Sequence, residues 1–198
     1  MKKDVEIFFD GYVHDFDSIY GHNHERSKIG KIADKIFRKS MYERFRMTLE
    51  FINDKNLNTI LDVGCGTGIY SLEYLKMGKD IVGIDLAKNM VDLSNAVSKE
   101  HFPNGKFEFI KGDYLSYEFD TKFDVAVLMG LFDYIKDAGS LLAKLKVDTK
   151  GMILGSFPKS NHYLAPYRRI RYRLMKCPLY LYNYNQIESL IKKNDFNN

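Results

Sequence analysis

The sequence predicts an α/β fold, a three-layer α/β/α sandwich in which helices cover both faces of a doubly wound, mostly parallel sheet. Short apolar runs alternate along the chain with stretches of helical periodicity, an order typical of parallel strands joined by right-handed crossovers. The run at 123–128 has an unalternated core, Val-Ala-Val-Leu, as in a strand buried on both faces. Residues 59–85 have the pattern of a strand, a glycine turn, a helix and a second strand. A ligand is therefore expected at the carboxyl ends of the strands, where the strand order reverses.

Each element is predicted from its own pattern. Apolar residues recur every three or four positions at 27–54, which indicates one long amphipathic helix or two shorter ones. Continuous apolar runs predict strands at 60–63, 81–84, 107–110, 123–128 and 151–156. Helical spacing predicts five further helices. One begins after Gly68, one spans 88–99, one contains Leu141, Leu142 and Leu145, and the last two cover 163–174 and 186–193.

Length and composition are those of one globular domain. The 198 residues, 45% of them hydrophobic, can form a core of ordinary size. The net charge of +4 is too small to indicate a nucleic-acid partner by itself. Cys65 and Cys177 lie far apart in the sequence, which predicts two reduced thiols and neither a disulfide framework nor a metal cluster. We expect no apolar leader and no membrane span, and hence a cytoplasmic protein.

Two parts of this single domain are expected. Residues 1–56 form an N-terminal part, an aromatic lid or brace at 5–20 followed by the helix, and residues 57–198 form the core with a basic insertion at about 159–180. His22 and His24 are two residues apart, but no partner has matching spacing. A solvated turn is therefore expected there, and no metal.

The glycine turn is the main candidate for ligand binding. Gly64, Gly66 and Gly68 alternate with small residues directly after the first core strand, and glycine lets a ligand approach where a Cβ would collide. The turn leads into a helix N-terminus, whose free N–H groups suit an anionic group. Asp85 ends the second strand, and its carboxylate can accept from the paired hydroxyls of a ribose. These features predict a nucleoside cofactor.

Several motifs follow the order of a known family. The runs LDVGCGTG at 61–68 and VGID at 82–85, then Met90, GD at 112–113 and FDV at 123–125, resemble the class I S-adenosylmethionine-dependent methyltransferases, which have a Rossmann-like fold. A nicotinamide dehydrogenase is the competing interpretation. However, Ile69 stands where a dehydrogenase has its third glycine, and Asp62 stands two residues before the first glycine, as in methyltransferases. The resemblance covers about residues 57–157.

The resemblance implies a role for each cofactor-binding residue. Asp62 would hold the ammonium end of S-adenosylmethionine, and Gly64, Gly66 and Gly68 would lie beside its methionine and ribose parts, with Cys65 covered by the cofactor. Asp85 would accept from the ribose hydroxyls, Leu86 and Met90 would pack on the adenine, and Asp113 would accept from the adenine amino group, with Tyr114 beside it. Met129 and Gly130 would lie under the sulfonium.

Candidates for a catalytic base follow the fourth and fifth strands. They are His162, Asp133 and Tyr134, and His162 is favoured because an imidazole titrates near neutral pH. A base is needed only if the acceptor must lose a proton. Residues 129–133 lack the Asn-Pro-Pro-aromatic signature of enzymes that methylate exocyclic amines and amides, and Cys65 is placed poorly for a nucleophile. Neither those substrates nor covalent catalysis is expected.

The expected function is methyl transfer to a small-molecule acceptor, on oxygen in preference to nitrogen. The segment after Pro158 loosely resembles O-methyltransferases of quinone and porphyrin synthesis. Two alternatives stay open: a methyltransferase acting on transfer RNA or other RNA, whose phosphates the arginines at 168–173 could meet, and a non-catalytic subunit with the same fold. The sequence after 193 does not contain the last two strands usual in the family. An exposed sheet edge could then pair in a homodimer, and a monomer is the other expectation.

Overall fold

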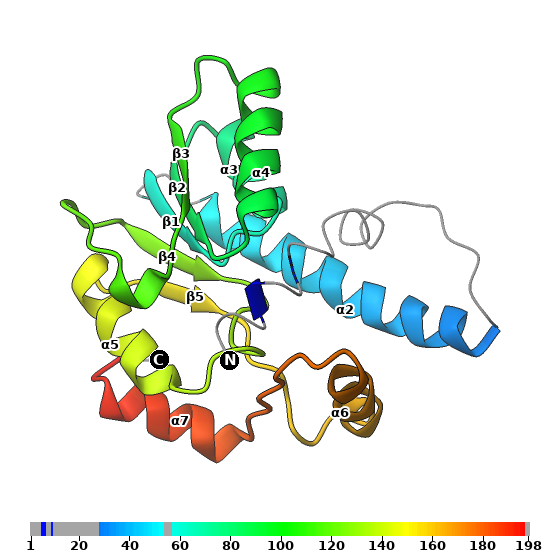
Figure 1. The fold of residues 1–198 in the computed structure, drawn as a ribbon. Helices are drawn as coiled ribbons and strands as arrows, with labels where there is room; N and C mark the ends of the chain where they lie inside the picture. Colours follow the sequence, from blue (N-terminus) through cyan, green and yellow to red (C-terminus); the bar gives the residue numbers. More distant parts are fainter. Residues whose placement is uncertain (1–4, 7–8, 10–27, 54–56, 197–198) are drawn as a thin grey trace.

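A five-stranded parallel sheet with the strand order β3-β2-β1-β4-β5 forms the centre of the protein (Figure 1). The computed structural model describes residues 5–6, 9, 28–53 and 57–196. Its strands are β1 (Thr59–Val63), β2 (Asp80–Asp85), β3 (Phe107–Lys111), β4 (Val125–Leu128) and β5 (Ile153–Gly155). The order reverses at β1, which pairs with β2 on one side and with β4 on the other. The doubly wound α/β fold expected from the sequence is confirmed.

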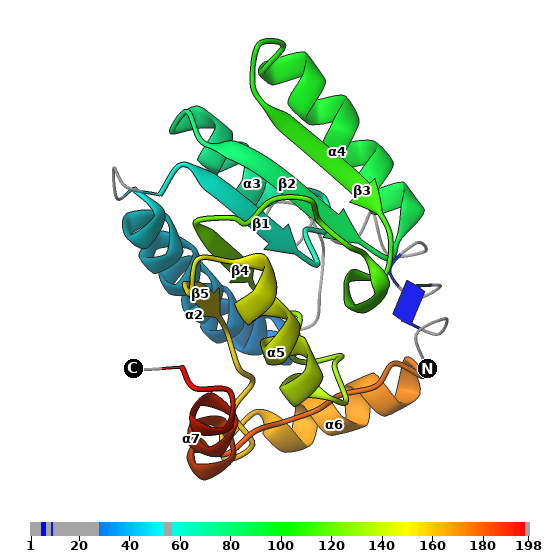
Figure 2. The same ribbon diagram turned by 90° about the vertical axis from the view of Figure 1, so that its left-hand side faces the viewer.

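Helices cover both faces of this sheet (Figures 1 and 2). The elements are α2 (Lys28–Ile52), α3 (Ile69–Lys76), α4 (Lys88–His101), the 3₁₀ turn η1 (Tyr114–Ser116), α5 (Ala138–Asp148), α6 (Ala165–Leu174) and α7 (Tyr184–Lys193). The long amphipathic pattern near the N-terminus forms one continuous helix of 25 residues, α2, and not two. Both views place α6 and α7 at the end of the molecule opposite β3 and α4.

The core has two layers, one on each face of the sheet. In β1, Ile60 packs in the cluster that contains Ile52 of α2, whereas the next residue, Leu61, packs in the cluster that contains Leu141 of α5. Successive strand residues point to opposite faces, so one strand supplies both layers. Every residue of β4 is 0% exposed, which confirms burial on both faces.

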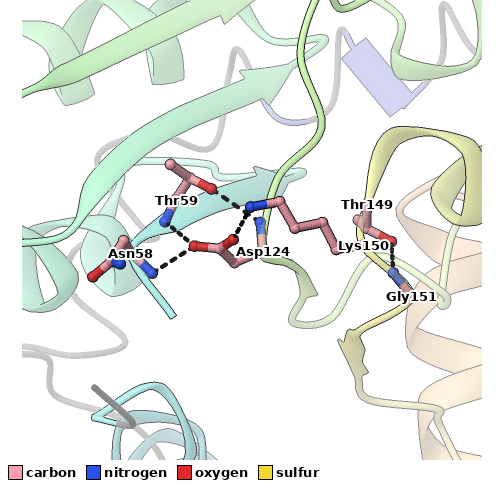
Figure 3. Close-up of polar contacts among 6 residues, drawn as sticks. All are labelled: Asn58, Thr59, Asp124, Thr149, Lys150 and Gly151. Carbon is pink, nitrogen blue, oxygen red and sulfur yellow. Dashed lines mark hydrogen bonds and ion pairs between the residues drawn. The ribbon is translucent and has the colours of Figure 1, made fainter. Parts of the chain in front are cut away.

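Asp124 ties β1 and the segment after α5 together at the amino ends of the strands (Figure 3). Its Oδ2 accepts from the backbone N–H groups of Asn58 (2.7 Å) and Thr59 (2.9 Å), and its Oδ1 accepts from Lys150 Nζ (2.6 Å). Burial opposes ionisation, but the Lys150 ammonium and the two N–H groups outweigh it and lower the pKa of Asp124 to about 2. The amino ends of the strands are therefore held together by the ionised carboxylate of Asp124.

Two strands are shorter than predicted. β4 begins at Val125 because the backbone at Phe123 forms only an isolated bridge with Thr149. β5 covers 153–155 of the predicted 151–156, and Gly151 has a left-handed φ of 97°, which is incompatible with an extended strand.

Part of the N-terminal prediction concerns residues without a described placement. His22, His24 and residues 10–20 of the expected lid lie outside the described residues. The division into an N-terminal part at 1–56 and a core at 57–198 within one domain stays a prediction. Among the helices that the structure describes, none has the length and apolar character needed to cross a membrane.

Candidate active site

A cavity of about 590 Å³ opens at the carboxyl ends of β1, β2 and β4. This is the edge of the sheet where the strand order reverses, the usual ligand site of such sheets. The glycine turn that follows β1 lines one side, and residues of α6 line another. The cavity therefore brings together residues from distant parts of the chain, as expected from the sequence.

The turn after β1 is shaped by three glycines with left-handed backbone angles. The φ angles of Gly64, Gly66 and Gly68 are 73°, 55° and 76°, values that side chains disfavour. Gly64 and Gly66 line the cavity. Gly68 is absent from its lining and precedes α3 as the N-cap, where an added Cβ would lie 3.1 Å from Ser94 Oγ. The structure thus gives Gly68 a packing role.

Asp85, the last residue of β2, holds the glycine turn in place. Its Oδ2 accepts from the backbone N–H of Gly66 and its Oδ1 from that of Ala87, both at 2.9 Å. Asp85 is partly exposed and lines the cavity. An ionised carboxylate only accepts hydrogen bonds, so Asp85 presents an acceptor to hydroxyl groups of a ligand in the cavity.

Asp62 is a buried acid beneath the turn. Its Oδ2 accepts from Ser71 Oγ at 2.6 Å, and the residue is 4% exposed. Burial raises the pKa of Asp62 to about 7; the charge of Asp85 adds to this rise and the Ser71 hydrogen bond opposes it. Asp62 lines the cavity, so a positively charged group bound there would favour the ionised carboxylate.

Cys65 lies in the turn, where it lines the cavity and is buried. Burial raises the pKa of its thiol well above the ordinary value, so the thiol is protonated at neutral pH and is a poor nucleophile. Neither Cys65 nor Cys177 forms a disulfide.

The residues expected around an adenine line the next part of the cavity. Leu86, Met90, Asp113 and Tyr114 all belong to the lining, and Met90 is almost fully buried. Asp113 caps η1 by accepting from the Leu115 N–H. Tyr114 donates its hydroxyl to Asp148 Oδ2 at 2.7 Å, away from any cavity ligand and towards α5. Only the rest of the tyrosine can contact a ligand.

Met129 and Gly130 follow β4 and border the far side of the cavity. Gly130 has a φ of 85°, and no atom lies within 4 Å of the position that a Cβ would take. Its backbone N–H donates to Ser156 Oγ at 2.9 Å. The loop after β4 is thus tied to the end of β5 and presents backbone to open space.

The three candidate bases line the cavity, but each is engaged. Asp133 forms an ion pair with Arg168 at 2.5 Å, and burial raises its pKa although Arg168 opposes the rise. The Tyr134 hydroxyl contacts the Tyr172 hydroxyl at 3.1 Å, and burial holds its pKa well above the ordinary value. Tyr134 therefore cannot serve as a base at neutral pH.

His162 is exposed at the rim, and its Nδ1 accepts from the Leu164 N–H at 3.2 Å. In a neutral imidazole that accepts at Nδ1, the proton lies on Nε2. His162 can then donate a hydrogen bond to a ligand, but it has no free basic nitrogen to offer. The base role favoured from the sequence stays a prediction that this tautomer does not support.

Arg44 of α2 is a site residue that the sequence did not reveal. Arg44 lines the cavity. It donates hydrogen bonds from Nε to the Tyr70 hydroxyl and from Nη1 to Ser156 Oγ, and both distances are 3.3 Å. In the sequence it is one of many charged residues of an amphipathic helix, so no local pattern marks it. From the N-terminal segment, Phe9 also lines the cavity and packs edge-to-face on Tyr134 with ring centroids 5.1 Å apart.

The described part of the chain contains no candidate metal site. Within it, no group of three or more His, Cys, Asp and Glu residues is arranged to hold a metal ion.

Comparisons with known proteins agree with this arrangement. Residues 60–147 match a family described as "Methyltransferase domain". A ubiquinone biosynthesis O-methyltransferase of Pseudoalteromonas translucida is 28% identical over 135 residues, which are 63% of this chain and 57% of that protein. An uncharacterized methyltransferase of Bacillus cereus is 26% identical over 137 residues, 69% of this chain and 57% of that protein. The chain thus spans less than two thirds of the length of these relatives.

Solved structures share the fold. Magnesium protoporphyrin IX methyltransferase from Synechocystis PCC 6803, solved with bound SAH, superposes with a TM-score of 0.78 over 98% of this chain and 88% of that chain, at 20% identity. Phospholethanolamine N-methyltransferase 2 of Haemonchus contortus gives a TM-score of 0.71 over 93% of this chain and 41% of that chain, also at 20% identity. The segment that matches the methyltransferase domain contains the glycine turn and Asp85, and the solved methyltransferase structures share the fold of this chain.

Proposed function

We propose that the protein transfers a methyl group from S-adenosylmethionine to an oxygen atom of a small-molecule acceptor. The cofactor supplies a methyl group on a positively charged sulfur, which a nucleophile can displace in line. One observation carries the proposal. Asp62, Asp85 and the glycine turn line the same cavity as Gly130 and two basic residues, Lys159 and Arg171. Its volume of about 590 Å³ lies within the ordinary range of small-molecule sites.

The residues at the strand ends fit this cofactor. Gly64 and Gly66 leave the backbone of the turn open to close approach. Asp85 lines the cavity with a carboxylate that can accept from the ribose hydroxyls. An ammonium group beside Asp62 would favour its buried carboxylate as the charged form. We therefore assign Asp62 to the ammonium end and Asp85 to the ribose.

The remaining cofactor contacts extend the same assignment. Leu86 and Met90 provide apolar surface for the adenine, and Asp113 provides an acceptor at the end of β3. We assign Met129 and Gly130 to the sulfonium and Cys65 to the underside of the cofactor, since all three line the cavity. Tyr114 contributes its ring or backbone, because its hydroxyl is bonded to Asp148.

The acceptor is proposed to reach the cavity already ionised. Asp133 is paired with Arg168, Tyr134 stays protonated and His162 presents a donor, so a neutral alcohol would find no ready base. A carboxylate or an acidic phenol needs none. Arg171 and Lys159 line the cavity and could bind such an anion. Alignment then supplies most of the rate enhancement, roughly 7–11 kcal/mol of the barrier for well-oriented reactants.

The test compares acceptors by the S-adenosylhomocysteine that each one yields. Aromatic carboxylic acids and acidic phenols should turn over, whereas neutral alcohols of the same shape should not. Arg171→Gln should raise the KM for the anionic acceptor by roughly tenfold, the value of about one charge-assisted hydrogen bond. Arg169→Gln is the matched control, because Arg169 lies on the same helix outside the cavity lining. Faster turnover of neutral alcohols, or equal effects of both variants, would refute the anionic acceptor.

Other functions are tested in the same preparation. An RNA methyltransferase is the alternative that the arginines of α6 could serve, and binding to transfer RNA that weakens steeply with salt would support it. A non-catalytic subunit would yield no S-adenosylhomocysteine with any acceptor. A cytoplasmic location and a monomer or homodimer stay predictions from the sequence.

A further inference from the structure

Helix α6 has two different long sides. Arg168, Arg171, Tyr172 and Met175 line the cavity. A second row, one residue out of phase, faces solvent: Tyr163, Tyr167, Ile170 and Leu174 are 64%, 54%, 63% and 79% exposed. Spacings of three and four residues place Tyr167, Ile170 and Leu174 in one stripe along α6, and Tyr163 lies in the turn before its first residue. These four residues are called the outer stripe below.

The outer stripe is unusual because it concentrates large apolar side chains where a globular protein has polar ones. Single exposed apolar residues are common, but a contiguous row marks a surface that contacts something apolar. Two of the four are tyrosines, whose rings combine an apolar body with a polar tip and are enriched where apolar and aqueous phases meet.

The charges around the stripe are of one sign. Arg169 and Arg173 are exposed on the neighbouring side of α6, and no acidic residue occurs in the helix. The segment 149–187 contains seven Lys or Arg residues and no Asp or Glu, although the whole chain has a net charge of only +4. The rest of the chain is therefore net negative by three charges. The basic charge is thus concentrated in the chain segment that contains α6.

We propose that α6 docks on the surface of an anionic phospholipid bilayer, with the outer stripe in the interface and Arg169 and Arg173 against the headgroups. A helix with an apolar stripe, aromatic residues and flanking arginines lies in the plane of such a surface. The row that lines the cavity lies one residue, roughly 100°, further around the same helix, so docking would place the mouth of the cavity beside the lipid. Figure 2 shows α6 at the periphery of the molecule, which leaves this side accessible.

Other occupants fit the stripe less well. A second copy of this chain would bring the same basic segment against itself, and like charges in contact oppose association. RNA would satisfy the arginines, but it would leave Ile170 and Leu174 without an apolar partner. An anionic bilayer satisfies the apolar row and the arginines together.

Vesicle co-sedimentation of the purified full chain tests the proposal. The vesicles are equal mixtures of phosphatidylglycerol and phosphatidylcholine, compared with phosphatidylcholine alone, at about 0.1 M salt. The protein should bind the anionic vesicles at least about tenfold more tightly than the neutral ones. Ile170→Ser with Leu174→Ser should weaken binding by roughly 100-fold, and Arg169→Gln with Arg173→Gln by roughly 25-fold.

Matched controls separate docking from a general loss of apolar surface. Val147→Ser on α5 and Met47→Ser on α2 remove side chains that are 65% and 62% exposed outside α6, and both should bind vesicles like the wild type. Thermal unfolding at the wild-type temperature shows that the α6 variants are folded. No wild-type binding to anionic vesicles, or equal losses in the control variants, would overturn the proposal. A homodimer that dissociates in the Ile170/Leu174 variant, or transfer RNA binding that depends on these two residues, would overturn it as well.

Discussion

Asp62→Asn is expected to stabilise the protein while it weakens cofactor binding. Asp62 is buried and accepts from Ser71, and asparagine has the same shape with an oxygen that can accept the same hydrogen bond. Burial raises the pKa of Asp62 from 3.8 to about 7. The ionised carboxylate is therefore costly in the folded protein without cofactor, and the neutral amide removes that cost.

The magnitude follows from the pKa. A rise from 3.8 to about 7 corresponds to roughly 4–5 kcal/mol, at about 1.4 kcal/mol for each unit. In a chain of this size, this raises the unfolding temperature by about 9–18 °C. Between about pH 4 and pH 7, the folded wild type binds a proton at Asp62 that the unfolded chain has lost. Its free energy of unfolding falls as the pH rises through this window. The gain from Asp62→Asn is thus small near pH 4 and complete above pH 7.

Thermal unfolding without cofactor, at pH values from about 4 to 8, measures the stability change, and calorimetry measures the affinity for S-adenosylmethionine. The variant should lose roughly 10- to 150-fold in affinity, the value of a hydrogen bond to a charged group. Asp80→Asn, which removes the same charge from a partly exposed position on β2, is the control and should change neither property. Lower stability of Asp62→Asn above pH 7, together with wild-type affinity, would refute the role given to this acid.

Three further substitutions test the site and the scaffold. Asp85→Asn replaces one of the two oxygens that accept from the N–H groups of Gly66 and Ala87. Calorimetry should therefore show at least about a tenfold loss of affinity for S-adenosylmethionine. Unchanged affinity would contradict the ribose assignment. Gly68→Ala forces a side chain into a φ of 76° and should cost roughly 1–2 kcal/mol of stability in urea unfolding, and a neutral effect would refute the backbone argument. Asp124→Asn should lower the unfolding temperature at pH 7. The difference from the wild type should vanish as the pH falls from about 4 to about 2, because the pKa of Asp124 is lowered to about 2. A difference that persists at pH 2 would count against the role of the ionised Asp124 carboxylate in holding β1 and Lys150 together.

Much of the fold could be predicted because its signals are local. The strand and turn at 59–68, the acid at Asp85 and the unalternated run of β4 lie within short windows, and period and glycine content identify them. The position of the cavity then follows from the parallel order of the strands.

The rest depends on contacts between distant segments. Arg44 and Ser156 are 112 residues apart and meet only in the folded chain. Asp133 becomes unavailable because α6 brings Arg168 to it. The Tyr114 hydroxyl, but not the rest of the residue, points away from the cavity because it donates to Asp148. Periodicity marked α6 as basic and amphipathic, but it could not tell which side would wall the cavity. Such facts are set by tertiary packing, which a single sequence does not display.

The central claim is that the cavity binds S-adenosylmethionine, and ligand-dependent thermal unfolding tests it most directly. A ligand at about 100 times its dissociation constant stabilises the folded state by roughly 2.7 kcal/mol, which corresponds to about 5–11 °C in a chain of this size. S-adenosylmethionine and S-adenosylhomocysteine should each produce this rise, NAD should produce none, and the rise should shrink in Asp85→Asn. A rise with NAD alone, or none with either S-adenosyl compound at saturating concentration, would contradict the account.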